Sequence, residues 1–141
     1  AALARKDRIA GLIGIAAAPD FTQRLQWTKL TPQQQKTVME EGLVQVPSNY
    51  EDDYIFTRAL FDDGARNLLL DGPIDLDVPL TLLHGQQDAD VPVEISLEIA
   101  RQVASSDVVL ELVKSADHRF SGPDELNRLA AAVDTMTEKL A

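Results

Sequence analysis

Cysteine is absent from the 141 residues of this chain. Its absence excludes disulfide bonds, thiolate ligands for a metal and a cysteine nucleophile. Positive charge is also scarce, because 13 Lys and Arg stand against 23 Asp and Glu and give a net charge of −10. Phosphate backbones and anionic lipid surfaces need a basic face, so we expect no nucleic-acid partner and no membrane docking.

The chain also lacks an apolar run long enough to span a bilayer, and it shows no signal peptide. Hydrophobic residues make up 45% and charged residues 26%, as in an ordinary globular domain, and 141 residues can bury one core. The missing cysteines fit a reducing compartment, so we expect the protein to be cytoplasmic.

Apolar, strand-like stretches alternate with helix-like stretches at both ends of the chain. Unbroken apolar runs are typical of strands covered on both faces in a parallel sheet. The sequence therefore predicts an α/β fold: part of a doubly wound sheet of about three parallel strands with flanking helices. The expected strands are 8–19, 78–85 and 107–115, and the expected helices are 1–7, 94–104 and a last helix with Ser121 as its N-cap.

Residues from about 21 to 77 differ from the rest of this single partial domain, which spans residues 1–141. They contain the only Trp, both Tyr and three of the four Phe, and we interpret them as a helical, lid-like insertion. Thr31, Pro32 and Gln34 form a capping box that predicts the start of a helix, and Gly42 predicts its end. A second helix is expected over 52–72, interrupted or ended near Gly64.

An aspartate and a histidine follow two of the expected strands at the point where each strand ends. Asp88 follows the strand "LTLLHG", and His118 follows "VVLELV" thirty residues later, a spacing that suits a strand–helix–strand return. Neighbouring parallel strands end at the same edge of a sheet, where active sites of such folds lie. A carboxylate that orients an imidazole is the supporting half of a nucleophilic triad.

The segments "HGQQDADVP" and "ADHRFS" resemble the C-terminal half of an α/β-hydrolase. In that family a G-x-x-D-x-x-V-P loop supplies the catalytic acid and a later turn supplies the histidine, which implies Asp88 as the acid and His118 as the base. The first strand and "DDGARNLLLDGPI" are similar to small bacterial esterases of the branch related to acyl-protein thioesterases. The resemblance implies hydrolysis of a small-molecule acyl ester or thioester through an acyl-serine, without a cofactor.

The family's nucleophilic serine lies in a G-x-S-x-G elbow, and this sequence contains no such motif. We therefore expect a C-terminal fragment, inactive alone, whose first residues match the end of the helix after the elbow. The serines present lack the strand–turn–helix setting of an elbow, so we expect none of them to replace it. They are Ser48, Ser96, Ser105, Ser106, Ser115 and Ser121.

Two residues rival the proposed pair. Asp90 could replace Asp88 as the acid, but it is better placed to cap the helix that starts near Val91 and Pro92. His84 ends a strand, and a hydrogen-bonded core or edge histidine is the better interpretation of it. The acidic clusters lack histidine at ligand spacing, so the sequence predicts no metal site.

Four apolar side chains of the insertion, Phe21, Leu25, Trp27 and Leu43, could line an acyl pocket or form ordinary core. A second hypothesis of another class is a non-catalytic α/β module that acts in binding or assembly. The apolar first strand would be an edge strand that invites pairing with another chain. On either hypothesis we expect a partner, which is a missing N-terminal half or a second copy of this chain.

Overall fold

A computed structural model of the protein describes residues 2–47 and 52–141, and Ser48 lies outside the described residues. The chain forms two compact units. One comprises Ala1–Ala18 and Leu70–Ala141, and the other comprises Pro19–Leu69. The second unit begins slightly before the insertion expected over about 21–77 and ends well before it. Its end is earlier because Ile74 and Leu76 are hydrogen-bonded to the backbone at 102–105 in the first unit.

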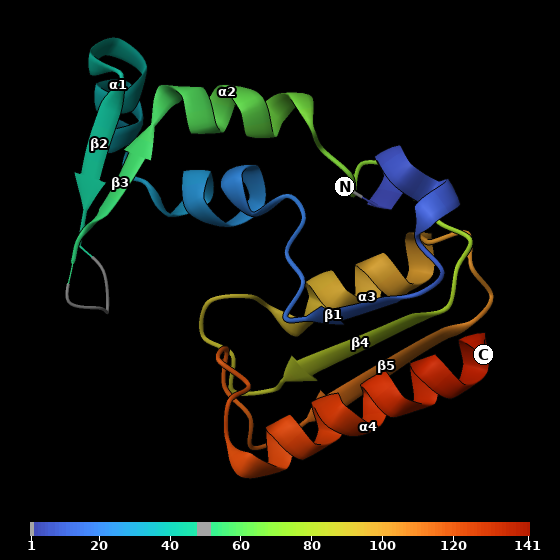
Figure 1. The fold of residues 1–141 in the computed structure, drawn as a ribbon. Helices are drawn as coiled ribbons and strands as arrows, with labels where there is room; N and C mark the ends of the chain where they lie inside the picture. Colours follow the sequence, from blue (N-terminus) through green and yellow to red (C-terminus); the bar gives the residue numbers. More distant parts are fainter. Residues whose placement is uncertain (1, 48–51) are drawn as a thin grey trace. The chain divides into compact units, whose positions relative to one another are not determined.

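The first unit contains a parallel three-stranded sheet in the order β1-β4-β5 (Figure 1). Its strands are β1 (Leu12–Ile15), β4 (Leu80–Gly85) and β5 (Val108–Val113). Ile15 pairs with Leu83, and His84 pairs with Leu112, so all three strands end at the same edge. This sheet with its flanking helices confirms the predicted fold class.

The first strand is much shorter than its apolar run, and it is an edge strand of this sheet. Its four residues are half-buried or exposed, so the expectation that both faces are covered is wrong for β1. Ala16 ends the strand with a φ of 44°, in the left-handed region that ordinary residues avoid. The expected opening helix is a 3-10 helix, η1 (Ala2–Arg8), with a kink at Arg5.

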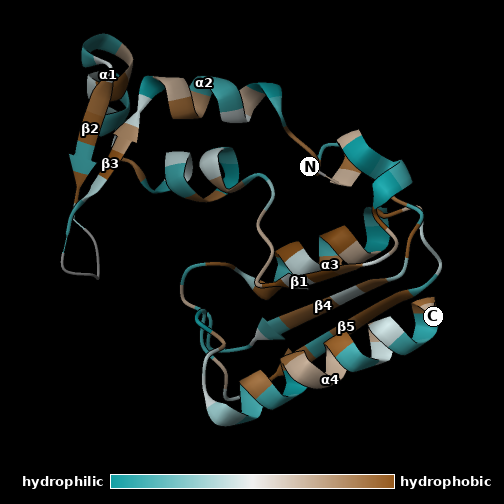
Figure 2. Cartoon of the chain, viewed as in Figure 1, coloured by the Kyte–Doolittle hydropathy of each residue, from teal (hydrophilic) through white to brown (hydrophobic). Residues whose placement is uncertain are grey.

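Helices α3 (Val93–Gln102) and α4 (Pro123–Leu140) lie on opposite faces of the sheet (Figure 1). Neighbouring residues of β4 point to opposite faces. His84 contacts Ser96 of α3, whereas Leu83 packs in a cluster that includes Leu129 of α4. Figure 2 shows hydrophobic and hydrophilic residues alternating along α4, as expected for a helix with one face on the sheet. Within the described residues, no helix has both the length and the apolar character needed to cross a bilayer.

The predicted N-caps of these two helices are wrong. The residue that caps α3 is Pro92 instead of Asp90, and the residue that caps α4 is Gly122 instead of Ser121. A side chain at Gly122 would place its Cβ 2.2 Å from Oε2 of Glu125, because that carboxylate folds back over the helix start. The start of α4 has no side-chain capping hydrogen bond, and Asp124 and Glu125 lie in its first turn, where their charges favour the helix N-terminus.

The second unit contains η2 (Thr22–Trp27), a π-helix, followed by α1 (Pro32–Glu41). The predicted capping box of α1 is present, and Gly42 ends the helix with a φ of 88°. An antiparallel pair, β2 (Leu43–Val46) and β3 (Tyr54–Thr57), precedes α2 (Arg58–Arg66). The core of this unit is made by Leu30, Val38, Val44, Phe56 and Phe61, with Trp27 packed against them.

The expectation of one helix over 52–72 is wrong, because its first part is the strand β3. Thr57 separates the two elements, since its side chain accepts a hydrogen bond from the backbone N–H of Leu60 and caps α2. Gly64 lies inside α2 and does not interrupt it. A Cβ at that position would lie 1.9 Å from Oγ1 of Thr22, so the glycine permits a close approach of η2.

Candidate active site

Asp88 lies in the loop after β4, where backbone donors surround its carboxylate. Its Oδ1 accepts hydrogen bonds from the N–H groups of Asp90 and Val91, both at 2.8 Å. The side chain is only 1% exposed. An aspartate that binds the backbone two and three residues further on folds the loop around itself. The loop therefore fixes the position of the carboxylate.

His118 lies in the loop after β5, which a second aspartate organises in the same way. Oδ1 of Asp117 accepts hydrogen bonds from the N–H groups of Arg119 and Phe120, at 3.0 and 3.2 Å. Phe120 has a φ of 49°, and its buried ring packs with Leu83 and Val113. Burial of an apolar side chain next to a left-handed residue anchors the turn that carries His118.

Gly85 lets the two loops approach each other. A Cβ at this position would lie 2.2 Å from the carbonyl oxygen of Ala116 and 2.7 Å from that of Asp117. Two backbone hydrogen bonds join the loops there, from Gln86 N–H to the carbonyl of Val113 and from Gln87 N–H to the carbonyl of Ala116, both 2.9 Å long. The glycine is thus a structural requirement of the site that the sequence analysis did not identify.

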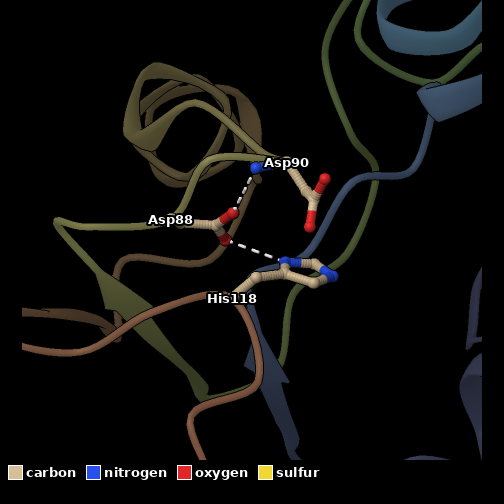
Figure 3. A group of neighbouring side chains, drawn as sticks. All are labelled: Asp88, Asp90 and His118. Atoms are coloured by element: carbon tan, nitrogen blue, oxygen red, sulfur yellow. Dashed lines mark hydrogen bonds and ion pairs between the residues drawn. The ribbon is translucent and has the colours of Figure 1, made fainter. Parts of the chain in front are cut away.

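The structure brings Asp88 and His118 into direct contact (Figure 3). Nδ1 of His118 lies 2.9 Å from Oδ2 of Asp88, and the histidine side chain is 39% exposed. Because the carboxylate can only accept, Nδ1 donates this hydrogen bond, and Nε2 keeps its lone pair in the neutral ring. A half-exposed imidazole with a free Nε2 lone pair and a buried carboxylate behind it can act as a general base.

The electrostatics of Asp88 favour its charged form. Burial alone would raise its pKa, but the N–H of Val91, the ring of His118 and the N–H of Asp90 donate to the carboxylate. Together with the charge that His118 can carry, these donors hold the pKa of Asp88 below its usual range. The carboxylate therefore stays ionised beside the imidazole at neutral pH.

His84 is a hydrogen-bonded core histidine, as the sequence indicated. Its ring is fully buried, with Nδ1 2.7 Å from Oγ of Ser96 and Nε2 3.0 Å from the carbonyl oxygen of Val91. Nε2 also lies 3.4 Å from Oδ2 of Asp88, so the carboxylate lies between two histidines, His84 and His118. Neither this contact nor the role of Ser96 was predicted from the sequence. The four-residue spacing of His84 and Asp88 across a strand end was the only signal for them.

Asp90 lies beside the pair without replacing Asp88 in it (Figure 3). Asp88, Asp90 and His118 each offer one ligand atom, and these atoms lie within 4.8 Å of one another. Both oxygens of Asp88 already accept hydrogen bonds, and Nδ1 of His118 is engaged with one of them. A cation would have to displace the Asp88–His118 bond, so the described geometry suits a hydrogen-bonded pair better than a metal centre.

The four side chains suggested for an acyl pocket fall into two groups. Leu25 is buried, and the ring of Trp27 packs edge-on against Phe61 with the ring centroids 5.0 Å apart. Phe21 and Leu43 are exposed, at 40% and 52%. Leu25 and Trp27 thus serve the interior of the second unit, and their role in substrate binding stays a prediction, as does that of Phe21 and Leu43.

A parallel sheet with helices on both faces, and with an aspartate loop and a histidine loop in contact after adjacent strands, defines the α/β-hydrolase fold. The comparisons with known proteins agree. The chain is 34% identical over 143 residues to the rat (Rattus norvegicus) protein named palmitoyl-protein thioesterase ABHD10, mitochondrial; this match covers 100% of the chain and 48% of the rat protein. No family model matches the chain.

Two solved structures have the same fold over almost the whole chain. A protein of Agrobacterium vitis S4 that is assigned as a hydrolase superposes with a TM-score of 0.85 and 36% identity, over 92% of this chain and 50% of that one. Mouse alpha/beta hydrolase domain-containing protein 10 superposes with a TM-score of 0.85 and 31% identity, over 99% of this chain and 56% of that one. The chain therefore has the α/β-hydrolase fold that its motifs resembled, and it spans about half the length of the curated relatives it matches.

Proposed function

We propose that Asp88 and His118 are the acid and the base of a serine hydrolase that cleaves carboxylic esters or thioesters. The observation that carries the proposal is the 2.9 Å contact between Oδ2 of Asp88 and Nδ1 of His118 at the carboxyl edge of adjacent parallel strands. The similarity to hydrolases, one of them named a thioesterase, supports it.

In the proposed reaction His118 moves protons at Nε2 while Asp88 holds its other nitrogen. Nε2 takes the proton of the nucleophilic serine as its Oγ attacks the acyl carbon, and then gives that proton to the leaving alcohol or thiol. Water attacks the acyl-serine in the second half, and Nε2 again takes and returns the proton. Asp88 stabilises the imidazolium in both halves without becoming protonated.

The nucleophile is the part of this proposal that the pair itself does not supply. Among residues 2–47 and 52–141, no serine hydroxyl is hydrogen-bonded to His118; the one serine bonded to a histidine is Ser96, on His84. The chain matches about half of each relative, and we assign the nucleophile and the oxyanion donors to the other half of such an enzyme. On this assignment, the 141 residues alone do not hydrolyse esters.

We propose an apolar acyl group as the part of the substrate that selects this enzyme, because the rat relative is named a palmitoyl-protein thioesterase. Phe21 and Leu43 are the exposed apolar side chains of the insertion that remain candidates for contacts with it. A cytoplasmic location stays a prediction from composition, whereas the name of the rat relative places that protein in mitochondria.

The test combines the chain with the half that its relatives have in addition. The chain is co-expressed with the N-terminal half of the rat relative, complex formation is measured by native mass, and the complex is treated with a fluorophosphonate probe and a palmitoyl thioester. We expect labelling and hydrolysis by the complex and neither by the chain alone. His118→Ala and Asp88→Asn should abolish hydrolysis, whereas the matched control Asp90→Asn should keep it.

Two results would contradict the proposal. One is an assembled complex that takes no label and hydrolyses no thioester. The other is hydrolysis by the chain alone that His118→Ala abolishes, because the nucleophile would then lie within these residues. Loss of activity in Asp90→Asn with retention in Asp88→Asn would transfer the role of the acid to Asp90.

A second candidate function is assembly through β1, which is an edge strand of the described sheet. Ile15 at its end is 38% exposed, and edge strands offer free backbone groups to another chain. On this proposal two copies pair edge to edge. A monomeric mass by light scattering at high micromolar concentration would count against it.

A further inference from the structure

The carboxylate of Asp88 has a second histidine beside it, His84, which takes no part in the hydrogen bond between Asp88 and His118. His84 and Ser96 are both 0% exposed, although both are polar. Two hydrogen bonds hold the ring of His84: Nδ1 is bonded to Ser96 Oγ of α3, and Nε2 is bonded to the carbonyl of Val91. Oδ2 of Asp88 lies 3.4 Å from the same Nε2.

The partners of His84 assign the proton on its ring. The carbonyl oxygen of Val91 can only accept, so Nε2 of His84 must carry a hydrogen. In the neutral ring Nδ1 then has a lone pair, to which the hydroxyl of Ser96 donates at 2.7 Å. The neutral form of His84 is thus the Nε2–H tautomer. His118 is the opposite tautomer, because its Nδ1 donates to Asp88.

Val91 links the two halves of this arrangement. Its N–H donates to Oδ1 of Asp88, and its carbonyl accepts from Nε2 of His84. The imidazole of His84 therefore fixes the backbone of Val91, which in turn binds the carboxylate of Asp88. The Nε2–H group of His84 also lies near Oδ2 of Asp88, the oxygen that accepts the hydrogen bond from His118. Ser96 fixes the orientation of the ring from a helix that is itself packed on the sheet.

We propose that His84, oriented by Ser96, is a positioning residue that fixes the Asp88 carboxylate and thereby the Nδ1–H tautomer of His118. The inference rests on the proposed function, since it concerns the same base. It differs from a purely structural role of His84, which would stabilise the fold without setting the tautomer of a ring in another loop.

The test reads the two tautomers directly. The chain has only two histidines, so ring nitrogen–proton correlation spectra of protein with 15N-labelled histidine contain two sets of signals. At a pH where both rings are neutral, we expect one ring with its proton on Nε2 and one with its proton on Nδ1. Finding the proton of neutral His84 on Nδ1 would overturn the inference, because Val91 would then lack its donor.

Variants separate positioning from stability. His84→Phe removes every donor of the ring and should shift His118 from the Nδ1–H form towards the tautomer mixture of free imidazole. His84→Gln keeps an N–H near the position of Nε2 and should restore the Nδ1–H form. Ser96→Ala should cause a smaller shift in the same direction, and the matched control Ser106→Ala, at an exposed serine with an identical change in side chain, should cause none.

Each outcome is decisive. If His118 lacks the Nδ1–H form in the unaltered protein, the proposed function fails together with this inference. If His118 has that form and keeps it unchanged in folded His84→Phe, only the positioning role is refuted. If His84→Phe does not fold, Ser96→Ala decides: a shift of the His118 tautomer that Ser106→Ala lacks supports the inference, and no shift overturns it.

Discussion

Replacing Gly85 by alanine is the change that tests most directly how the site is built. The new Cβ would lie 2.2 Å from the carbonyl oxygen of Ala116, 2.5 Å from its carbonyl carbon and 2.7 Å from the oxygen of Asp117. All three atoms belong to the backbone, so no side chain can rotate away. Ordinary contacts begin near 3.4 Å, and the His118 loop must therefore retreat by about 1 Å.

The expected loss of stability follows from the contacts that this retreat breaks. The hydrogen bonds of Gln86 and Gln87 to the carbonyls of Val113 and Ala116 would lengthen, at about 0.5–1.5 kcal/mol each. Crowding an already packed position adds about 1–3 kcal/mol. We therefore expect Gly85→Ala to lower the free energy of unfolding by about 2–6 kcal/mol. The same movement would pull His118 away from Asp88.

Urea unfolding followed by circular dichroism measures the loss of stability. Amide exchange at Gln86 and Gln87 measures the weakening of their two hydrogen bonds to the His118 side of the site. Gly72→Ala is the matched control, because Gly72 belongs to the same unit and a Cβ there meets nothing within 4 Å. That variant should raise the free energy of unfolding slightly, by less than about 1 kcal/mol, because alanine reduces the entropy of the unfolded chain. A Gly85→Ala protein as stable as Gly72→Ala, with amides equally protected, would refute the argument that Gly85 sets the distance between the loops.

Two further changes test the charge of the acid and the packing of the second unit. The pKa of Asp88 is lower in the folded protein than in the unfolded chain, so its stabilisation is complete above the unfolded value of about 4 and disappears as the pH falls through the folded value. Asp88→Asn should lower the free energy of unfolding by about 1–3 kcal/mol at neutral pH, as measured by urea unfolding at several pH values. The difference in stability between the two proteins should become smaller in acid, and a difference that stays constant would contradict this. Gly64→Ala should destabilise by about 1–3 kcal/mol despite the better helix propensity of alanine, because its Cβ meets Thr22. Adding Thr22→Ala should recover part of the loss in a double-mutant cycle, and additive losses would show that the two residues do not compete for space.

The elements that were predicted correctly are those with a local signal. The apolar runs of β4 and β5, the helix between them and the capping box of Thr31 each depend on residues close in the sequence. The proximity of Asp88 and His118 was also predictable, because both follow neighbouring parallel strands, which end at the same edge of the sheet. The topology of a parallel sheet thus predicts that the two residues lie close together, although it predicts no distance between their atoms.

The elements that were predicted wrongly depend on partners far away in the sequence. The residues of β3 are strand-favouring types, but the hydrophobic stretch runs directly into α2, and the pairing with β2 separates the strand from the helix. Gly64 and Gly85 likewise meet atoms of Thr22 and Ala116, many residues away. A single sequence shows a glycine but not the neighbour that requires it.

The short segment from His84 to Val91 combines several of these demands in one loop. Gly85 admits the His118 turn, Asp88 collects the backbone N–H groups, and Val91 connects Asp88 to the ring of His84. All of these contacts lie within the unit of the parallel sheet, and none uses a residue of Pro19–Leu69. The geometry of the Asp88–His118 pair is therefore set by the register of β4 and β5 and by the two loops that follow these strands. The contacts that place the base therefore do not depend on residues of the insertion.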